Sequence, residues 1–517
     1  MRHVSCPRRT AGCVLGNTPT TARITAMNLR PLALAALCAL SPAVHAVSPI
    51  ADPDFGSVGW TSLFESGGGS QDEYAVAHAR TADGGWVVAL ELPGGGANNG
   101  NGKRIGLFRL DANGQQVSSG FGTFGAVYKD AWLTSVTDMA IDSQGRIVVV
   151  GATPGPGGMN DFGVVRFNPD GSDDTSFAGD GGTAFGFDVP GINSDDTPTS
   201  VLIDSGDKIV VAGNWWVSGF SSRFGAVRLN VDGAVDDTWG SIDNDQGGRR
   251  GSVADFVDGM AAYAQRILRI DQGFYVITGT SAVGNNDTDF AACILGTTGQ
   301  EFANHLGCKT FAVNLPGPGG SLFDTLGDAV LVNPTTILLV GSSSGSIAAT
   351  RIKVGIAPGG WAYTQLDRDP AFIGTPNESA PNTFIDDTPH SIGKSAAVAP
   401  NGQMLLVGDT TDNSPGLAEA ATQPDGTPLP RHGLLLQLNA NGQSDASFGY
   451  NGKAYFDHPF GNGYSYLTQL QRVSYAGSQP VIIGSSSFSS SSPTDMDGFI
   501  TRLYDDAIFA NGFESQF

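Results

Sequence analysis

The hydrophobic positions of this chain recur in short runs separated by turns, and residues 138–182 show the pattern completely. There the run IVVVG is followed by a loop rich in Gly, Pro and Asn and by a second run, FGVVRF; a tight N-P-D-G turn and the tag SFAGDGG then end the unit. Runs of this length, bounded by turn residues, are typical of β-strands, and helical periodicity is nearly absent. The pattern predicts an all-β protein.

The same two runs recur in alternation along the chain. The first run stands at residues 85–90, 146–151, 208–213, 274–279, 337–341, 404–408 and 481–484. The second run stands at residues 105–110, 162–167, 224–229, 290–295, 347–352, 433–438 and 498–503. One column of the second run holds arginine, at Arg109, Arg166, Arg228, Arg351 and Arg502. We interpret this column as a repeated structural pair with an Asp of the D-G turn, and the whole as a repeat array.

Weaker runs complete each unit, as at residues 137–142 and 181–187, so a unit has four short strands. One four-stranded sheet cannot cover both of its faces, so the units must pack on one another, and a ring leaves no open end. We predict a seven-bladed β-propeller of four-stranded blades. Residues 51–60 carry the tag and fourth strand of a unit without its first three. Residues near 52–64 are therefore predicted to supply the outer strand of the seventh blade and close the ring.

The best units share a more specific signature, namely D-G-K/R-I-V-V-A/V-G and then F-x-x-x-R-L/F-N-x-D-G-x-x-D-x-x-F. Its second half reads NPDGSDDTSF at residues 168–177 and NVDGAVDDTW at residues 230–239. This signature resembles the delta-60 repeat of bacterial exported proteins. The resemblance implies a propeller-like array and brings no shared catalytic residues.

Residues 27–46 are typical of a signal peptide. They contain one cationic residue, Arg30, an apolar run at residues 32–40, and small residues, Val44 and Ala46, at positions −3 and −1 of a cleavage site. We therefore assign residues 1–26 to an extension upstream of the true start, 27–46 to a signal peptide, 47–504 to a propeller of seven repeats and 505–517 to a C-terminal tail. The apolar run is too short to span a membrane. We expect a secreted or periplasmic protein without a membrane span.

The charge of the chain is strongly negative, at −22. Removal of residues 1–46 would take away five Arg and no acid and bring the charge to −27. Such a surface repels nucleic acid and anionic lipid, so we expect neither as a partner. The two cysteines that remain, Cys293 and Cys308, would be exported to a compartment that permits disulfides. They are either bridged, closing a loop worth roughly 3 kcal/mol, or two buried free thiols.

Loop lengths predict the binding face. If the strands of a blade run outward from the axis, the loops between strands two and three and between blades share one face, and these loops are long and dissimilar. Binding residues concentrate on loops that a rigid scaffold presents. On this long-loop face Trp215, Trp216 and Phe220 are the candidate ligand-binding residues, because aromatic rings can stack on sugars or clamp a peptide. The alternative is that they fold back as a local cap.

Catalytic and metal motifs are not found in this sequence. Acidic clusters such as residues 168–174 echo calcium loops but lack the twelve-residue pattern, so we expect turn chemistry, with a weak structural calcium as the alternative and no other cofactor. We predict a monomeric, non-catalytic binding protein for an extracellular glycan or protein. The alternative is a carbohydrate-active hydrolase or lyase with carboxylates near the axis. Its candidate residues are Asp195, Asp196, Asp386 and Asp387.

Overall fold

The computed structural model describes residues 51–504 apart from short gaps. The gaps are residues 65–71, 95–102, 131, 156–157, 188–194, 217–221, 244–247, 250, 255–260, 285–286, 303–306, 314–321, 357–362, 376–380, 389, 412–430, 450, 458, 461–462, 465–466 and 488–494. The chain divides into two units, Met1–His45 and Ala46–Phe517, and only the second contains described residues. The expected leader, the C-terminal tail and Phe220 lie outside the described residues.

Short antiparallel sheets make up the described part of the chain, which contains no α-helix. Three sheets of consecutive strands are β2 (Tyr74–Arg80), β3 (Trp86–Pro93), β4 (Lys103–Leu110) and β5 (Ala126–Lys129); β6 (Asp138–Ile141), β7 (Ile147–Pro154), β8 (Asn160–Phe167) and β9 (Gly182–Phe185); and β25 (Ser391–Val398), β26 (Met404–Thr410), β27 (His432–Leu438) and β28 (Lys453–Phe456). A fourth sheet is β10 (Thr197–Ile203), β11 (Ile209–Trp216), β12 (Ser222–Leu229) and β15 (Ser252–Ala254).

The middle of the chain forms a larger sheet. Its strands are β16 (Ala262–Arg269), β17 (Tyr275–Gly284), β18 (Asp287–Leu295), β19 (Cys308–Phe311), β20 (Leu322–Asn333), β21 (Thr336–Ser343), β22 (Ser346–Ile356), β23 (Tyr363–Arg368) and β24 (Thr383–Ile385). Two antiparallel groups, β16–β19 and β20–β24, are joined only by a short parallel pairing of β18 with β20. This junction falls where the sequence signature is weakest.

Small elements decorate this framework. They are the two-stranded sheets β13 (Ile242–Asp243) with β14 (Gly248–Arg249) and β29 (Pro459–Phe460) with β30 (Gly463–Tyr464), and the single 3-10 turns Ser205–Asp207 and Asp271–Gly273. No helix long and apolar enough to cross a bilayer occurs in the part of the chain that the structure describes.

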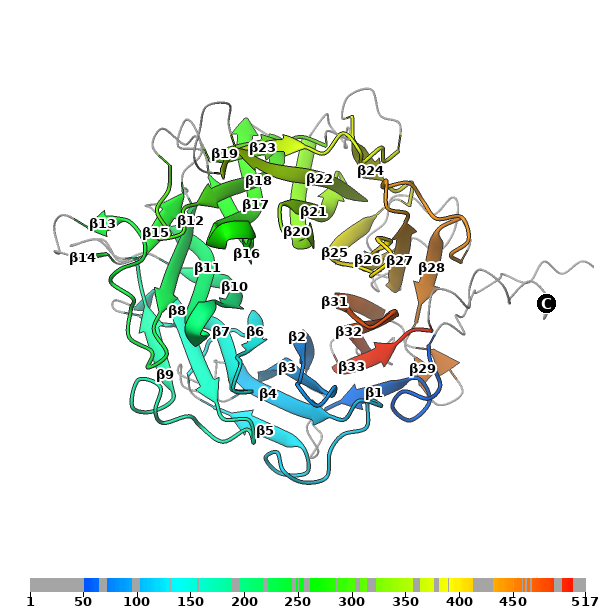
Figure 1. The fold of residues 1–517 in the computed structure, drawn as a ribbon. Helices are drawn as coiled ribbons and strands as arrows, with labels where there is room; N and C mark the ends of the chain where they lie inside the picture. Colours follow the sequence, from blue (N-terminus) through cyan, green and yellow to red (C-terminus); the bar gives the residue numbers. More distant parts are fainter. Residues whose placement is uncertain are drawn as a thin grey trace, which may run out of the picture. The chain divides into compact units, whose positions relative to one another are not determined.

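Within the second unit the sheets are arranged around a central space, which is surrounded by a set of inner strands (Figure 1). These inner strands, each in contact with those of the neighbouring sheets, are β2, β6, β10, β16, β20, β25 and β31 (Leu467–Ala476). The hydrophobic core lies between sheets rather than within one. For example, Leu107 of β4 and Val149 of β7 share one fully buried cluster. Sheets with two apolar faces therefore bury both by packing against their neighbours.

The last sheet combines both ends of the described chain. Its order is β1 (Trp60–Leu63), β33 (Met496–Arg502), β32 (Gln479–Ser487) and β31, with Trp60 opposite Thr501. The predicted pairing of residues near 52–64 with the second run of the last unit is thus present. Ile483 of this sheet also shares a buried cluster with Val88 of β3, so the first and last sheets pack together.

A recurring arrangement, which we call the latch, ties each tag to the next unit. In the first of these latches, Asp52 forms an ion pair with Arg502, with 2.8 Å between Oδ2 and Nη2. The Arg502 guanidinium also lies 5.0 Å from the centre of the Phe55 ring. Phe55 is fully buried and covers Gly114, where a β-carbon would come within 2.5 Å of the ring. Gly114 also has φ +76, so glycine is required there on two grounds.

Equivalent latches correct one sequence-based interpretation. Arg166 pairs with Asp174 at 2.7 Å and lies over Phe177, and Arg351 pairs with Asp369 at 2.7 Å. Arg166 and Arg351 therefore pair with the Asp of the Asp-x-x-aromatic sequence and not with the Asp of the D-G turn that was expected, whereas Arg109 does pair with the Asp of a D-G turn, Asp83. The reason is that the turn carboxylates are already used locally. For example, Asp170 accepts the backbone N–H of Ser172.

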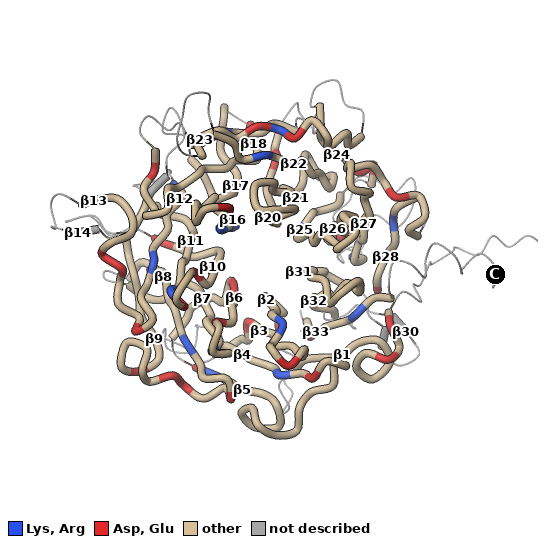
Figure 2. Tube along the Cα trace, in the orientation of Figure 1, with Lys and Arg blue, Asp and Glu red and all other residues tan. Residues whose placement is uncertain are grey.

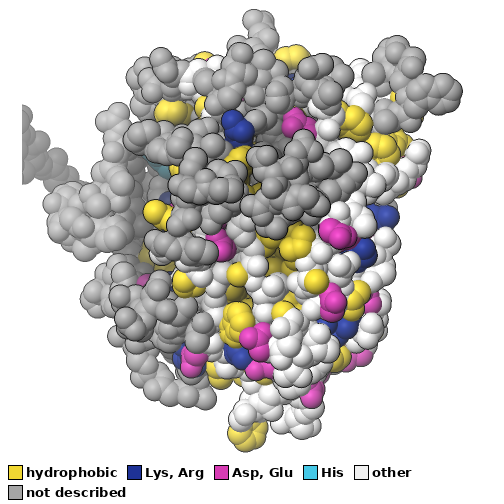
Figure 3. Space-filling model, turned by 90° about the vertical axis from the view of Figure 1, so that its left-hand side faces the viewer, with side chains coloured by type: hydrophobic (Ala, Val, Ile, Leu, Met, Phe, Trp, Pro, Cys, Tyr) yellow, Lys and Arg dark blue, Asp and Glu magenta, His cyan; other side chains and the backbone are white. Residues whose placement is uncertain are grey.

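Charged side chains of both signs are interspersed over the described surface. Figure 3 shows acidic and basic side chains next to one another on one side of the molecule, with hydrophobic ones scattered between them. Several form exposed ion pairs, such as Lys129 with Asp173 at 2.5 Å. Pairs of this kind contribute little stability individually, about 0–1 kcal/mol. Charged positions also lie on inner strands such as β6 and β16 (Figure 2), where their surroundings are different.

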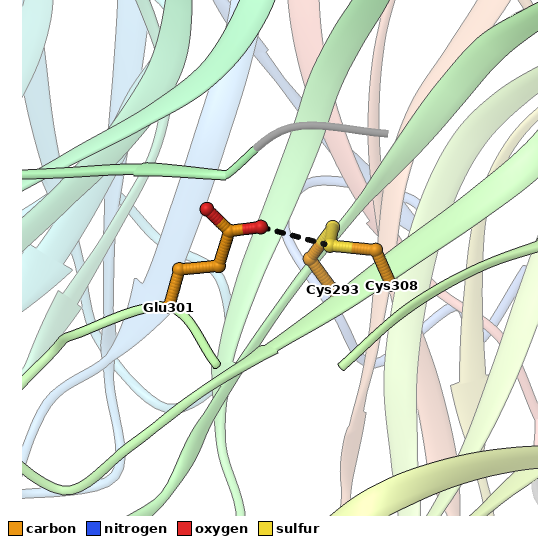
Figure 4. Close-up of a disulfide and its surroundings, with 3 residues drawn as sticks. All are labelled: Cys293, Glu301 and Cys308. Atoms are coloured by element: carbon orange, nitrogen blue, oxygen red, sulfur yellow. Dashed lines mark hydrogen bonds between the residues drawn. A yellow bond between two sulfur atoms is a disulfide. The ribbon is translucent and has the colours of Figure 1, made fainter. Parts of the chain in front are cut away.

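Cys293 and Cys308 are joined by a disulfide in the structure (Figure 4). They face each other on the antiparallel strands β18 and β19, and the Cys293 side is fully buried. Glu301 Oε1 lies 3.9 Å from Cys308 Sγ. A disulfide sulfur carries no hydrogen, so this approach is a contact rather than a hydrogen bond. The bridge fixes the outer strand β19 to the middle of its sheet.

Candidate functional site

The inner strands share an irregularity that shapes the axis. Pairing registers shift by one residue in β2, β10, β16, β20, β25 and β31, as happens at a β-bulge. A bulge opposes two residues to one, so two successive side chains can be directed to one side of the sheet. The extra residues, Val76, Thr199, Gln265, Gly327, Lys394 and Gln471, all line one cavity. Repetition of one backbone feature around the axis thus creates a pocket.

This axial pocket has a volume of about 830 Å³. Its wall combines polar and apolar groups, with Thr137, Thr199 and Thr325 among the polar lining residues. Ser344 and Gly345, from the turn between β21 and β22, also line it, so the pocket opens on the face that carries the loops between second and third strands. This is the long-loop face chosen from the sequence, although the pocket is built mainly from strands.

An ion-pair network forms the floor of the axial pocket. Asp138 on β6 accepts Arg472 Nη1 at 2.8 Å and Arg266 Nη1 at 3.1 Å, and Arg266 Nε lies 3.4 Å from Asp328. Asp328 also accepts the hydroxyl of Ser395 at 2.6 Å. These side chains come from five different inner strands, namely β6, β31, β16, β20 and β25. The contacts between them therefore cross the axis. The network thus links five inner strands to one another beside the pocket.

Electrostatics at the floor follow from burial and charge pairing. Burial alone would lower the pKa of Arg266, but the carboxylates of Asp328 and Asp138 outweigh it and raise that pKa. On the far side of the network, His78 bonds Ser474 Oγ at 2.6 Å. Burial, together with Arg472 and Arg266, lowers the pKa of His78 to about 3. His78 is therefore neutral at physiological pH, and a weak base.

The two tryptophans predicted to bind ligand lie near this face but outside the pocket lining. The sequence placed Trp215 and Trp216 on a loop, whereas both end strand β11, because the hairpin strands extend to pair Trp215 with Arg223. Both are half-buried. The Trp215 ring lies 6.2 Å from Phe187 and 5.6 Å from the Arg223 guanidinium, and Trp216 lies 5.9 Å from Tyr263. Their described neighbours are aromatic and cationic.

The four aspartates considered for catalysis are not among the residues that line the axial pocket. Asp195 accepts both the backbone N–H and the side-chain amide of Asn160 at 2.9 Å, and the fully buried Asp196 accepts the backbone N–H of Phe187 at 2.7 Å. Asp386 pairs with Lys453 at 2.6 Å, and Asp387 is a further partner of Lys453. Each of the four thus holds its own interblade segment in place and none faces the pocket.

The sequence analysis missed the residues that do form the pocket. Arg266, Lys394 and Arg472 each stand in or beside the weak first run of a unit, where no motif marks them. The one available signal is positional: Arg266 and Arg472 both follow the bulge residue of their inner strands, and Lys394 is itself the bulge residue of its strand. Within the described part of the chain, no group of three or more His, Cys, Asp or Glu is arranged to hold a metal ion.

Comparison with known proteins bears on the repeats. A family model described as a β-propeller domain of unknown function (DUF5122) matches residues 143–177 and 207–238. The chain carries β-propeller repeats. These two matches cover the N-x-D-G turn and the Arg column of the units that gave the clearest signature, Arg166 and Arg228 included. No curated protein matches the chain in sequence.

Solved structures with similar arrangements include three of different function. An ulvan lyase of polysaccharide lyase family PL25 is 10% identical, with a TM-score of 0.41, and the match covers 86% of this chain and 96% of that one. The WD40 β-propeller domain of Doa1 is 8% identical, with a TM-score of 0.38 and coverages of 85% and 95%. A glucose dehydrogenase is 11% identical, with a TM-score of 0.35 and coverages of 86% and 98%. They carry no argument about activity.

Proposed function

We propose that this chain is an exported, seven-bladed β-propeller, closed by its N-terminal strand, that binds a ligand in the axial pocket without catalysing a reaction. The pairing of β1 with β33 and the cluster shared by Ile483 and Val88 support closure. Export rests on the signal peptide expected at residues 27–46. A propeller of this kind gives a rigid frame on which a pocket can keep its shape.

The observation that carries the proposal is a pocket whose acids are all engaged. Hydrolysis of a glycosidic bond needs two carboxyl groups placed on either side of the bond. Glu91 and Asp328 are the acidic residues that line the pocket. Glu91 pairs with Lys103 at 3.1 Å and accepts a hydrogen bond from the backbone N–H of Val136. Asp328 pairs with Arg266 in the network at the pocket floor. Such a site favours recognition over acid–base chemistry.

The ligand class follows from the wall of the pocket. Hydroxyl and amide groups of Thr, Ser and Gln line part of it, and aromatic surface is added by Tyr74 and by Phe323, which is 46% exposed. Rings beside polar groups suit sugars and extended peptides. We propose a glycan as the ligand, and a peptide is the other outcome of the test.

Filling the pocket tests this proposal. Gln265 is exposed, lines the pocket and makes one hydrogen bond, to the Gly327 carbonyl. Gln265→Trp should occupy the cavity and abolish binding on an array of glycans and peptides. Gln144→Trp is the matched control, because Gln144 is also exposed but lies in the turn between β6 and β7, at the other end of the inner strands. Both variants should keep the wild-type thermal unfolding temperature.

The outcomes separate the alternatives. Binding that survives Gln265→Trp but is lost in the Trp215→Ala/Trp216→Ala double variant would move the site to the tryptophans. Absence of any ligand for the wild type on the array would contradict the proposal. Loss of binding in Gln144→Trp as well would mean that the pocket is not the site.

A further inference from the structure

A smaller recess opens from the axial pocket, with a volume of about 260 Å³. Tyr74, Val76, Lys394 and Gln471 line both cavities, so the recess is continuous with the pocket at these residues. Gln469 and Ser485 complete its lining, and the recess therefore lies between β2 of the first sheet and the strands of the last sheet. A ligand in the pocket can extend a group into this recess.

Lys394 gives the recess its charge. The charges of the pocket floor cancel, because Arg266 and Arg472 are matched by Asp138 and Asp328. Glu91 is matched by Lys103. Among the described residues, the Lys394 ammonium has neither an ion pair nor a hydrogen bond. The buried Asp409 is an electrostatic partner of Lys394, but this carboxylate already pairs with Arg431, so the Lys394 ammonium can still serve a ligand anion in a chain of net charge −22.

The surroundings of Lys394 add neutral hydrogen-bonding groups. The side chains of Gln469 and Gln471 offer both donors and acceptors, whereas the phenol of Tyr74 is already hydrogen-bonded to Asp72. The hydroxyl of Ser485 accepts a hydrogen bond from the backbone N–H of Ala75 at 2.9 Å, which fixes the recess wall. An ammonium flanked by amides can bind an anion that carries a neighbouring hydroxyl.

We infer that this recess binds the carboxylate of a sugar acid, with Lys394 as its cationic partner. This inference rests on the proposed function and specifies its ligand. In a uronic acid the carbon that bears the carboxylate is bonded to the ring oxygen and to a carbon that carries a further oxygen, within reach of the flanking amides, whereas an acidic peptide side chain has no oxygen there. The low-dielectric walls of a pocket strengthen a charge-assisted hydrogen bond from an ammonium to a carboxylate.

The test compares acids with their esters. Galacturonate, glucuronate and mannuronate oligosaccharides are each offered as the free acid and as the methyl ester, which keeps the sugar and removes the charge. Calorimetry should show that the wild type binds at least one acid about tenfold or more tightly than its ester. Lys394→Gln should abolish this preference, and Lys394→Arg, which keeps the charge, should retain it. Because Lys394 is only half-buried, the two variants should fold alike.

The results distinguish the inference from the proposed function. Equal binding of acids and esters, both lost in Gln265→Trp, would overturn the role of Lys394 and leave the axial pocket as the site. Binding of neutral glycans or peptides alone would do the same. An acid preference that survives Lys394→Gln would place the carboxylate elsewhere. Failure of every acid, ester, neutral glycan and peptide would contradict both.

Discussion

The latch at the N-terminus can be removed with one substitution, Phe55→Ala. The Phe55 side chain is fully buried and lies between the Arg502 guanidinium and Gly114. Truncation of a buried Phe costs about 3–5 kcal/mol, because the transfer free energy of the ring is lost and a cavity remains. The free energy lost when the ring is removed from beside the Arg502 guanidinium is included in that range. We expect about 4 kcal/mol, a large part of the 5–15 kcal/mol that typically stabilises a folded protein.

Phe177→Ala is the matched control. Phe177 is equally buried, its ring centre lies 4.5 Å from Arg166, and it also covers a turn glycine, Gly233. The latch of Phe177 joins two neighbouring units. The latch of Phe55 instead holds the segment before β1, which pairs with β33. Both variants should lose about 4 kcal/mol in denaturant unfolding. Only Phe55→Ala should free β1 and raise the amide hydrogen exchange of β33.

Two results would refute this reasoning. If Phe55→Ala costs less than about 1 kcal/mol while Phe177→Ala costs the expected amount, the N-terminal latch does not stabilise the last sheet. If hydrogen exchange in β33 rises equally in both variants, the effect is a general loss of stability and not the release of β1. In that case the pairing of Trp60 with Thr501 would not depend on Phe55.

Two further changes test single features. The double variant Cys293→Ser/Cys308→Ser should lose roughly 3 kcal/mol of unfolding free energy, as expected for a closed loop of this length, and reductant should destabilise the wild type but not the variant. Asp289 is buried near Asp324 and Asp287, and burial first and then these two charges raise its pKa to about 6. A carboxyl whose pKa is raised on folding loses stability as the pH rises from about 4 through about 6. Asp289→Asn should therefore stabilise the protein at pH 7 by on the order of 1–3 kcal/mol, with the difference vanishing below about pH 4 in unfolding experiments at several pH values; an unchanged difference across this range would contradict the assignment.

The strands were predictable because their pattern is local. Runs such as residues 146–151 and 162–167 alternate with turns that only a few residue types can make, and the structure has β7 and β8 there. The four-stranded sheets followed from the same pattern. Tryptophans 215 and 216 were misplaced because strand ends depend on how far the partner strand continues, here to Ser222, and the loop composition does not record this.

The axial pocket was not predictable for a different reason. Asp138, Arg266 and Arg472 are far apart in sequence and meet only because their inner strands surround one axis. A charge in a weak run resembles an ordinary surface residue until the neighbouring sheets are in place. The aspartates that were chosen, such as Asp196, follow loops, and loops here need carboxylates to satisfy their own backbone N–H groups.

The pairing of β1 with β33 has a kinetic consequence. The ion pair of Asp52 with Arg502 joins residues 450 positions apart, whereas most strand pairs in this protein are hairpins. The entropy lost on closing a loop grows only slowly with its length, but this contact cannot form until nearly the whole chain is available. The hairpins should therefore assemble first and the last sheet should be completed last. Until then β33 presents an unpaired edge, so the final step of folding is also the period of greatest exposure to aggregation.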